Sequence, residues 1–184
     1  MDANIYSIPI TKITGDAASL GEFRGSVLLV VNVASQCLFT PQYEKLEALY
    51  ERFRELGFAV AGFPANDFKE QEPGTNEEIH SFCTVSYGVK FPMYGKITVA
   101  GSGKHPLYAA LIAAQPEAIS VGGNPFRQQL KGWGVPTTEE PEVSWNFEKF
   151  LVNRAGEVVK RFTPETAPDA PELLAAIEAE LAKG

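Results

Sequence analysis

Apolar and polar residues alternate along this chain in blocks that predict strands separated by helices. The most apolar stretch, residues 27–33, is nearly continuous and rich in β-branched side chains, as is typical of a strand covered on both faces. Helix signals follow, with Thr40 as the expected N-cap, Pro41 at the first helical position and Gly57 as the stop. Between these signals, apolar residues recur at helical spacing at Tyr43, Leu46, Leu49, Tyr50 and Phe53.

The later segments repeat this alternation. Residues 58–63 form a second apolar run, and a capping box at 75–78 opens a helix on which Ile79, Phe82 and Cys83 share a face. The other expected elements are an N-terminal hairpin within 5–19, a strand at 96–99, a helix at 106–114, a hairpin with strands at 147–152 and 157–162, and a last helix after Pro171. Together they predict one α/β layered domain spanning 1–184, with a mixed sheet.

Residues 122–144 are the least regular part of the chain. The segment is rich in Gly, Pro, Thr and Gln, and its pattern has neither helical nor strand period. Loops of this length are uncommon and often functional. A lid, an interface and a simple insertion all stay open as interpretations.

Composition narrows the class of protein. The apolar fraction of 45% and charged fraction of 21% are ordinary for a soluble globular chain of 184 residues. The formal charge of −7 argues against nucleic acid or an anionic membrane as a partner, since both favour a basic face. No apolar run approaches the roughly 20 residues that span a bilayer, and the N-terminus lacks signal-peptide features. With only two cysteines, we expect a cytoplasmic protein.

Cys37 stands between the first buried strand and the first long helix. An ordinary thiol is only about 3% thiolate at pH 7, so a reactive one needs its anion stabilised. The positive end of the helix that begins near Thr40 would provide such stabilisation. Free cysteines are also among the most buried residue types. From position alone, a reactive thiol and an inert core cysteine both stay open.

The chain offers few conventional partners for a cysteine nucleophile. Only His80 and His105 exist, the first in an acidic helix start and the second beside a proline, so neither a Cys–His pair nor a zinc site is favoured. Neutral donors are available instead at Gln71, Trp145 and Asn146, which could hydrogen-bond a thiolate. By spacing alone, an ordinary structural role is favoured for each: Gln71 as a solvated loop residue, Trp145 as a core aromatic and Asn146 as a turn residue.

Three motifs change this picture. They are Asn-Val-Ala-Ser-Gln-Cys at 32–37 followed by Thr-Pro-Gln-Tyr at 40–43, Gln-Glu-Pro-Gly-Thr-Asn-Glu-Glu-Ile at 71–79, and Trp-Asn-Phe-Glu-Lys-Phe-Leu at 145–151. In this order they resemble the motifs of the glutathione peroxidase family, above all its bacterial, cysteine-type, single-chain members. The resemblance implies a thioredoxin-like fold, with a central mixed β-sheet flanked by helices.

The resemblance also implies a chemistry. It carries a catalytic tetrad onto Cys37, Gln71, Trp145 and Asn146, with no metal or bound cofactor. The Cys37 thiolate would reduce hydrogen peroxide and organic hydroperoxides, becoming a sulfenic acid in an antioxidant cycle. A monomer or dimer is expected.

The second cysteine acquires a role by the same resemblance. Cys83 matches the resolving cysteine of thioredoxin-dependent members, which would form a Cys37–Cys83 disulfide that thioredoxin reduces. A disulfide needs Cα atoms within about 7 Å, so we expect residues 81–88 to unwind during turnover. Two alternatives stay open: a glutathione-dependent peroxidase in which Cys83 resolves nothing, and a thiol redox sensor or relay. Glutathione would need basic residues, for which the candidates are Lys69, Arg127 and Lys131.

Three positions depart from the family pattern. Ala65 stands where a further cysteine is usual, Asp67 replaces glutamine, and Leu38 replaces a glycine beside Cys37. A negative charge at Asp67, if close, would raise the pKa of Cys37. Leu38 would narrow access to the thiol or change the backbone of the turn.

Overall fold

The computed structural model describes residues 4–184, and its centre is a four-stranded sheet in the order β4-β3-β5-β6. The strands are β3 (Val27–Val33), β4 (Phe58–Pro64), β5 (Lys149–Val152) and β6 (Val158–Phe162). β3 pairs in parallel with β4 and antiparallel with β5, which in turn pairs antiparallel with β6. The predicted mixed sheet and late hairpin are therefore confirmed.

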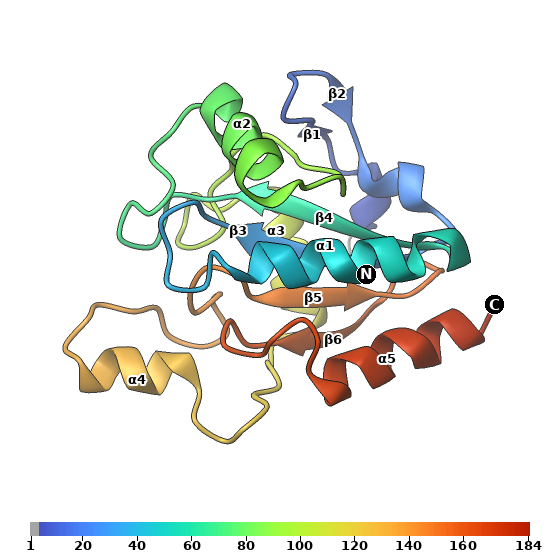
Figure 1. Ribbon diagram of the computed structural model, residues 1–184. Helices are drawn as coiled ribbons and strands as arrows, with labels where there is room; N and C mark the ends of the chain where they lie inside the picture. The colour runs from blue at the N-terminus through green and yellow to red at the C-terminus, as the bar shows by residue number, and fades with distance from the viewer. Residues whose placement is uncertain (1–3) are drawn as a thin grey trace.

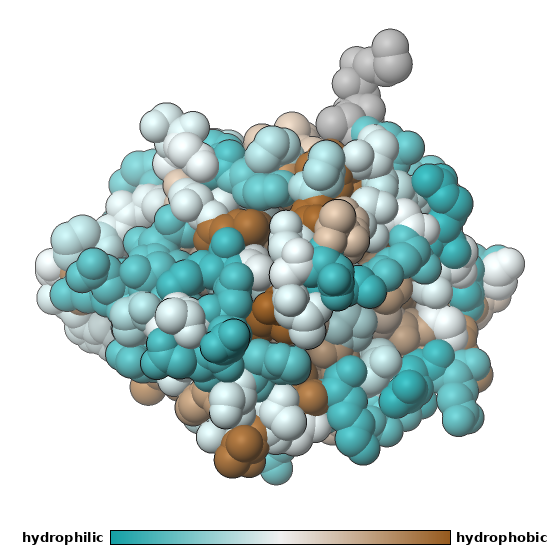
Figure 2. Space-filling model, turned by 90° about the horizontal axis from the view of Figure 1, so that it is seen from above, coloured by the Kyte–Doolittle hydropathy of each residue, from teal (hydrophilic) through white to brown (hydrophobic). Residues whose placement is uncertain are grey.

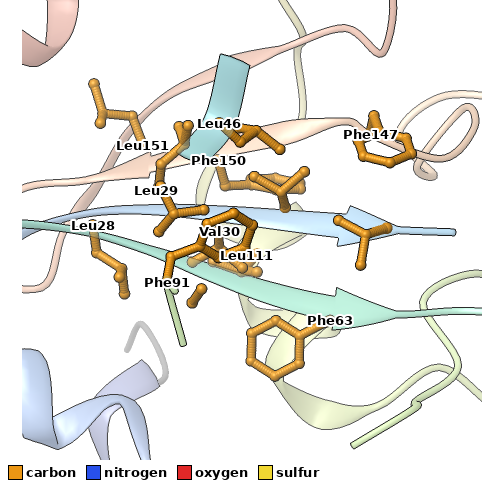
Figure 3. Close-up of a cluster of buried hydrophobic side chains, with 14 of the residues drawn as sticks. Leu28, Leu29, Val30, Leu46, Phe63, Phe91, Leu111, Phe147, Phe150 and Leu151 are labelled. Carbon is orange, nitrogen blue, oxygen red and sulfur yellow. The ribbon is translucent and has the colours of Figure 1, made fainter. Parts of the chain in front are cut away.

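Helices cover both faces of this sheet, which explains the continuous apolar run of β3. In Figure 1, α1 (Gln42–Phe53) and α5 (Pro171–Ala182) pass in front of the sheet and α3 (Pro106–Ala114) lies behind it. Every residue of β3 is buried. Figure 3 shows Leu46 of α1 and Leu111 of α3 among the sheet side chains that form the core.

The N-terminal hairpin is present but small. Its strands β1 (Ile10–Thr11) and β2 (Ala17–Ala18) pair antiparallel, between the 3-10 helices η1 (Ile5–Ser7) and η2 (Leu20–Phe23). A third 3-10 turn, η3 (Arg54–Leu56), extends α1 until Gly57 stops it in a left-handed conformation with φ 91°. The predicted stop is confirmed, since a glycine adopts this conformation without strain.

Two further helices lie near the ends of the strands. α2 (Asn76–Tyr87) opens with the predicted capping box, because Thr75 accepts from the Glu78 N–H while the Glu78 side chain accepts from the Thr75 N–H. Ile79 and Cys83 face the core as expected, and Phe82 is half-buried. α4 (Phe126–Gly132) is a short helix inside the segment 122–144, for which the sequence pattern had predicted no element.

The strand expected at 96–99 is not formed, and this prediction was wrong. The segment is apolar enough for a strand, but side chains take its backbone donors: Lys96 N donates to Asn76 Oδ1 at 2.9 Å and Val99 N to Asp67 Oδ2 at 2.8 Å. Ile97 N donates to the carbonyl of Pro64, the last residue of β4, at 2.9 Å. Tertiary contacts thus replace a strand ladder here.

Two predicted boundaries also need correction. α1 begins at Gln42 with Pro41 in the cap position and no side-chain cap bond, so Thr40 is not the N-cap. Strand β5 begins at Lys149 rather than at 147, because Phe147 has φ 69°, which no strand residue adopts.

The face of the molecule that lies above the sheet in Figure 1 is largely polar. Figure 2, which views the molecule from the side of α2 and the N-terminal hairpin, shows mainly hydrophilic side chains with small, separate apolar patches. Among residues 4–184, no helix has the length and apolar character needed to cross a membrane.

Candidate active site

Cys37 lies in a tight turn that connects β3 to α1. Thr40 shapes this turn, because its Oγ1 accepts from Cys37 N at 2.9 Å and donates to Ala34 O at 2.8 Å. The backbone N–H of Phe39 then donates to Cys37 Sγ at 3.3 Å. The residue Cys37 as a whole is only 7% exposed, so little of it is in contact with solvent.

The pKa of Cys37 reflects a competition. Burial raises the pKa of the thiol above its ordinary value, and this is the largest influence. The Phe39 N–H, the side-chain amide of Asn146, the indole of Trp145 and the charge of Lys149 each lower it, without offsetting the burial fully. The resting thiol is therefore protonated at neutral pH. The hydrogen-bond donors that would stabilise its thiolate are already in place.

The positive end of α1 does not act on the thiol in the expected way. The first N–H groups of the helix donate to carbonyls of the turn, from Gln42 N to Phe39 O at 2.8 Å and from Tyr43 N to Thr40 O at 3.0 Å. The backbone N–H that reaches the sulfur is that of Phe39, which precedes the helix. The prediction of a backbone donor near Cys37 was right, but its source was wrong.

Trp145 and Asn146 reach the thiol from the segment that leads into β5. Asn32, the polar residue of β3, donates from Nδ2 to Trp145 O at 3.0 Å, and its own carbonyl accepts from Phe147 N at 2.6 Å. Both side chains are buried, Trp145 at 4% exposure and Asn146 at 0%. The left-handed backbone of Phe147 ends the segment and lets the strand begin two residues later.

Gln71 joins this group through Asn146. The Asn146 Nδ2 donates to Gln71 Oε1 at 3.0 Å, and the Gln71 carbonyl accepts from Gln36 N at 3.0 Å, next to Cys37 in the chain. An asparagine amide has two N–H groups, so one can serve Gln71 while the other serves the sulfur. Gln71 does not itself shift the pKa of Cys37. The structure thus brings all four predicted residues together, with Gln71 behind Asn146.

Cys83 is a free, fully buried thiol on α2, and the reduced chain has no disulfide. Burial raises the pKa of Cys83 to about 11. The Tyr43 hydroxyl lowers it, although its geometry falls short of a full hydrogen bond, and the charge of Glu72 has a smaller, raising effect. In this conformation Cys83 is a protonated core residue.

The departures from the family pattern have small effects on the site. Leu38 is 70% exposed and does not adopt a positive φ, so it neither covers the thiol nor needs glycine geometry. Asp67 accepts from Val99 N and does not contribute to the pKa of Cys37. Both expected disturbances were wrong, because one side chain points to solvent and the other is engaged elsewhere.

The predicted basic residues do not converge. Arg127 donates to Thr138 O at 2.9 Å and to Glu142 O at 2.6 Å, and Lys131 pairs with Glu139 at 3.1 Å. Lys69 alone lies beside Trp145, on the wall of an open cleft. The three therefore do not form one anion site.

The histidines lie apart from any cluster of ligands. His80 is exposed on α2, and His105 caps α3 by accepting from Leu107 N at 3.1 Å. Within residues 4–184, no group of three or more His, Cys, Asp or Glu side chains could hold a metal ion.

Three residues around the site were missed by the sequence reasoning. Asn32 positions Trp145, and its signal was a polar side chain inside an otherwise apolar strand. Thr40 had been assigned to the helix but holds Cys37. Lys149 is fully buried, donates to Pro164 O at 2.9 Å and Thr166 O at 2.6 Å, and has a pKa lowered to about 7 by desolvation. Nothing in the sequence pattern marked Lys149 as buried.

Comparisons with known proteins agree with this geometry. A family model described as glutathione peroxidase matches residues 5–112. The chain is 45% identical over 183 residues to the thioredoxin/glutathione peroxidase BtuE of Escherichia coli (strain K12), with 100% of both chains covered. It is also 45% identical over 175 residues to the hydroperoxy fatty acid reductase gpx1 of Synechocystis sp. (strain ATCC 27184 / PCC 6803 / Kazusa), covering 95% of this chain and 94% of the relative.

A solved structure gives the same result for the fold. The crystal structure of T. cruzi GPX1 matches with a TM-score of 0.70 at 28% identity, over 98% of this chain and 97% of that one. The predicted thioredoxin-like arrangement of sheet and helices is thereby confirmed.

Proposed function

This chain belongs to the glutathione peroxidase family and is a peroxidase that reduces hydroperoxides; from that premise, we propose that Cys37 is the residue oxidised by the peroxide. Trp145, Asn146 and Gln71 complete its catalytic group, and hydrogen peroxide and organic hydroperoxides are its substrates. The observation that carries the assignment is the set of donors around one sulfur: the Phe39 N–H, the Asn146 amide and the Trp145 indole.

The first step follows from these contacts. The sulfur of Cys37 attacks the terminal oxygen of the peroxide, a sulfur–oxygen bond forms, and the oxygen–oxygen bond breaks. The proton released by the thiol passes to the departing oxygen, which leaves as water or an alcohol, and Cys37 becomes a sulfenic acid. Because the resting thiol is protonated, the donors have their largest effect in the transition state, where the sulfur carries negative charge.

Cys83 completes the cycle in this proposal. Its thiol attacks the Cys37 sulfenic acid, a disulfide forms, and water leaves. A dithiol of thioredoxin then restores both cysteines through a mixed disulfide. A buried thiol with a pKa of about 11 is a poor nucleophile, so Cys83 must leave its present environment before it reacts.

Peptide mapping tests the two-cysteine cycle. The protein is treated with one equivalent of hydrogen peroxide, alkylated without reductant and digested. We expect a linked peptide containing Cys37 and Cys83, and we expect Cys83→Ser to accumulate the sulfenic acid instead. A sulfenic acid that persists in the wild-type protein, with no linked peptide, would show that Cys83 does not resolve it.

Turnover measurements identify the reductant and distinguish an enzyme from a relay. Peroxide consumption is followed with a thioredoxin system and with glutathione in parallel, using wild type, Cys37→Ser and Cys83→Ser. We expect rapid multiple turnover with thioredoxin that requires both cysteines. Fast glutathione turnover by Cys83→Ser would instead favour the glutathione-dependent alternative, and a single slow turnover with a trapped mixed disulfide would favour a relay.

A further inference from the structure

Glu47 of α1 holds the segment of chain that follows α2. Its Oε1 accepts from Lys90 N at 2.8 Å and from Phe91 N at 3.2 Å. Both bonds join a backbone N–H to a carboxylate, and hydrogen bonds to a charged group are stronger than those between neutral groups. One side chain of α1 therefore fixes two consecutive residues just beyond the end of α2.

We propose that Glu47 is a positioning residue for Cys83: its two bonds form a latch that keeps the end of α2 closed, and their release sets the rate at which Cys83 reaches Cys37. The latch consists of the Glu47 carboxylate and the N–H groups of Lys90 and Phe91. The inference rests on the proposed disulfide step, because it concerns how Cys83 leaves the core. It gives that step a residue that controls the movement and takes no part in the chemistry.

The latch is joined to Cys83 through consecutive backbone bonds. Val89 N donates to Cys83 O at 3.1 Å, and the next N–H along the chain, that of Lys90, donates to Glu47. Movement of this segment away from α1 would thus draw Val89 from the Cys83 carbonyl. Gly88, with φ 60°, lies between the helix and the latch, and no other atom lies within 4 Å of the place of a Cβ. The backbone can therefore change direction at this glycine without a steric clash.

Aromatic rings pack the same segment against α1. The ring centroid of Phe91 lies 6.4 Å from those of Tyr43 and Tyr50. Tyr87, the last residue of α2, lies 5.5 Å from Tyr43. Hydrophobic contacts are non-directional, whereas hydrogen bonds depend steeply on distance and angle. The bonds to Glu47 therefore determine where the segment lies along α1, which the rings alone would not.

The other side of the segment is not tightly packed. A pocket of about 170 Å³ lies between α2 and the N-terminal hairpin, which are neighbours above the sheet in Figure 1. Cys83, Val89 and Phe91 line it from one side, and Ile13 lines it from the hairpin. Ile13 N donates to Met93 O at 3.1 Å, so the chain is held again two residues after Phe91. The segment between the end of α2 and Met93 thus has room to move once the latch opens.

Alkylation of Cys83 by iodoacetamide measures this opening. Cys83 is fully buried, so the reagent reaches it only when the end of α2 opens. The rate is measured in Cys37→Ser, where Cys83 is the sole cysteine, alone and combined with Glu47→Ala or Glu47→Gln. The matched control is Glu44→Ala, which changes an exposed carboxylate three residues earlier on α1.

The expected rates follow the strength of the latch. Glu47→Ala should speed alkylation about tenfold, because two bonds to a charged group are lost. Glu47→Gln keeps an amide oxygen that can accept both N–H groups without a charge, so it should speed alkylation only about threefold. Glu44→Ala should leave the rate unchanged. An unchanged rate in Glu47→Ala overturns the proposal.

Hydrogen exchange separates local opening from a general loss of stability. In Glu47→Ala, the backbone amides of residues 84–91 should exchange about tenfold faster, whereas those of β3 should exchange at the rate of the parent protein. Equal acceleration in β3 would mean that the substitution destabilises the whole fold, and it overturns the proposal.

The same substitutions with Cys37 intact test the link to turnover. After a pulse of hydrogen peroxide, Glu47→Ala should form the Cys37–Cys83 disulfide about tenfold faster than wild type, at an unchanged rate of sulfenic acid formation. Faster alkylation with an unchanged disulfide rate overturns the proposal. A slower disulfide rate also overturns it, and would show that Glu47 guides Cys83 toward Cys37 rather than retaining it.

Failure of the latch and failure of the two-cysteine cycle are distinguishable. If wild type forms the disulfide and Glu47→Ala changes neither alkylation nor disulfide formation, only the latch is refuted. If wild type forms no disulfide, the two-cysteine cycle is refuted, and the proposal falls with it whatever the alkylation rates.

Discussion

The reactivity of Cys37 depends on a few donors rather than on a charged base. Burial raises its pKa, and Phe39, Asn146 and Trp145 act against that rise. This balance differs from that of a cysteine paired with a protonated histidine, where a neighbouring positive charge lowers the pKa, because the charge of Lys149 is the smallest of the influences on Cys37.

Asn146→Ala tests this balance. The change removes one donor to the sulfur and the bond to Gln71, so we expect the pKa of Cys37 to rise further. The rate constant with hydrogen peroxide should fall by about 10²–10³-fold at pH 7, in line with the loss of a preorganised donor. Its pH profile should shift to higher pH, because more alkali is then needed to form the thiolate. Stopped-flow oxidation measures both.

Asn124→Ala is the matched control, since Asn124 is exposed in the segment before α4. It should leave the rate and its pH profile unchanged. An Asn146→Ala protein with a wild-type profile would contradict the role assigned to the amide.

The raised pKa of Cys83 predicts how the free energy of unfolding depends on pH. Its pKa rises from about 9 in the unfolded chain to about 11 in the fold, so the folded state retains a proton that the unfolded state loses. The resulting stabilisation is present below pH 9 and is lost as pH rises through 11, amounting to about 3 kcal/mol in total. Urea unfolding between pH 8 and 11 should therefore show a steeper decline for wild type than for Cys83→Ser. Parallel curves for the two proteins would contradict this linkage.

At the scale of elements, the proposed disulfide step requires α2 to be both well formed and able to open. Its capping box fixes the N-terminus, and Gly88 closes the C-terminus with φ 60° while Val89 N donates to Cys83 O at 3.1 Å. The carbonyl of Cys83 is thus part of the helix end. Local opening of this end would release Cys83 without disturbing the sheet.

Two substitutions near this end should change the rate of disulfide formation in opposite directions. Gly88→Ala introduces left-handed strain of about 1 kcal/mol but no clash, because no atom lies within 4 Å of the added Cβ. Ser86→Ala, on the exposed face of α2, strengthens the helix by roughly 0.5 kcal/mol. After a peroxide pulse, Gly88→Ala should form the disulfide faster than wild type, and Ser86→Ala more slowly. Identical rates in all three would mean that helix opening does not limit the step.

The helices and strands also show which parts of the fold could be predicted from the sequence alone. The buried strand 27–33, the capping box at 75–78 and the late hairpin were all predictable, because local pattern and tertiary packing agree there. The absent strand at 96–99 was not, since its N–H groups are taken by side chains distant in the sequence. Phe147 has a left-handed backbone that directs Asn146 toward the thiol. Because the residue is not a glycine, the sequence pattern did not predict this conformation.

Some features of the candidate site could likewise be predicted from the sequence and others could not. Motif resemblance identified which side chains gather, but not that Gln71 reaches the sulfur only through Asn146, nor that Lys149 is buried behind it. Such details depend on long-range packing, which no local pattern records.

At the scale of the whole molecule, one buried ion pair joins the candidate site to the sheet and to the end of the segment 122–144. Glu148, two residues after Asn146, accepts from Arg161 Nε at 2.6 Å and from Ser144 Oγ at 2.8 Å. Arg161, on β6, also donates to the carbonyls of Gln115 and Pro116. Both charged side chains are almost fully buried, at 1% and 2% exposure.

Glu148→Gln should therefore destabilise the entire fold. The substitution keeps the shape but leaves the Arg161 charge buried without its counter-charge, which costs about 3–5 kcal/mol when a buried pair is broken. Urea unfolding should show one cooperative transition at a lower midpoint with an unchanged slope, because the loss affects stability and not the surface exposed. Glu178→Gln, which breaks an exposed pair with Arg52, is the control and should cost less than about 0.5 kcal/mol. If both variants unfolded at the same midpoint, the pair at Glu148 would not stabilise the fold, and Ser144 to Asn146 would be positioned by backbone contacts such as the Asn32 amide alone.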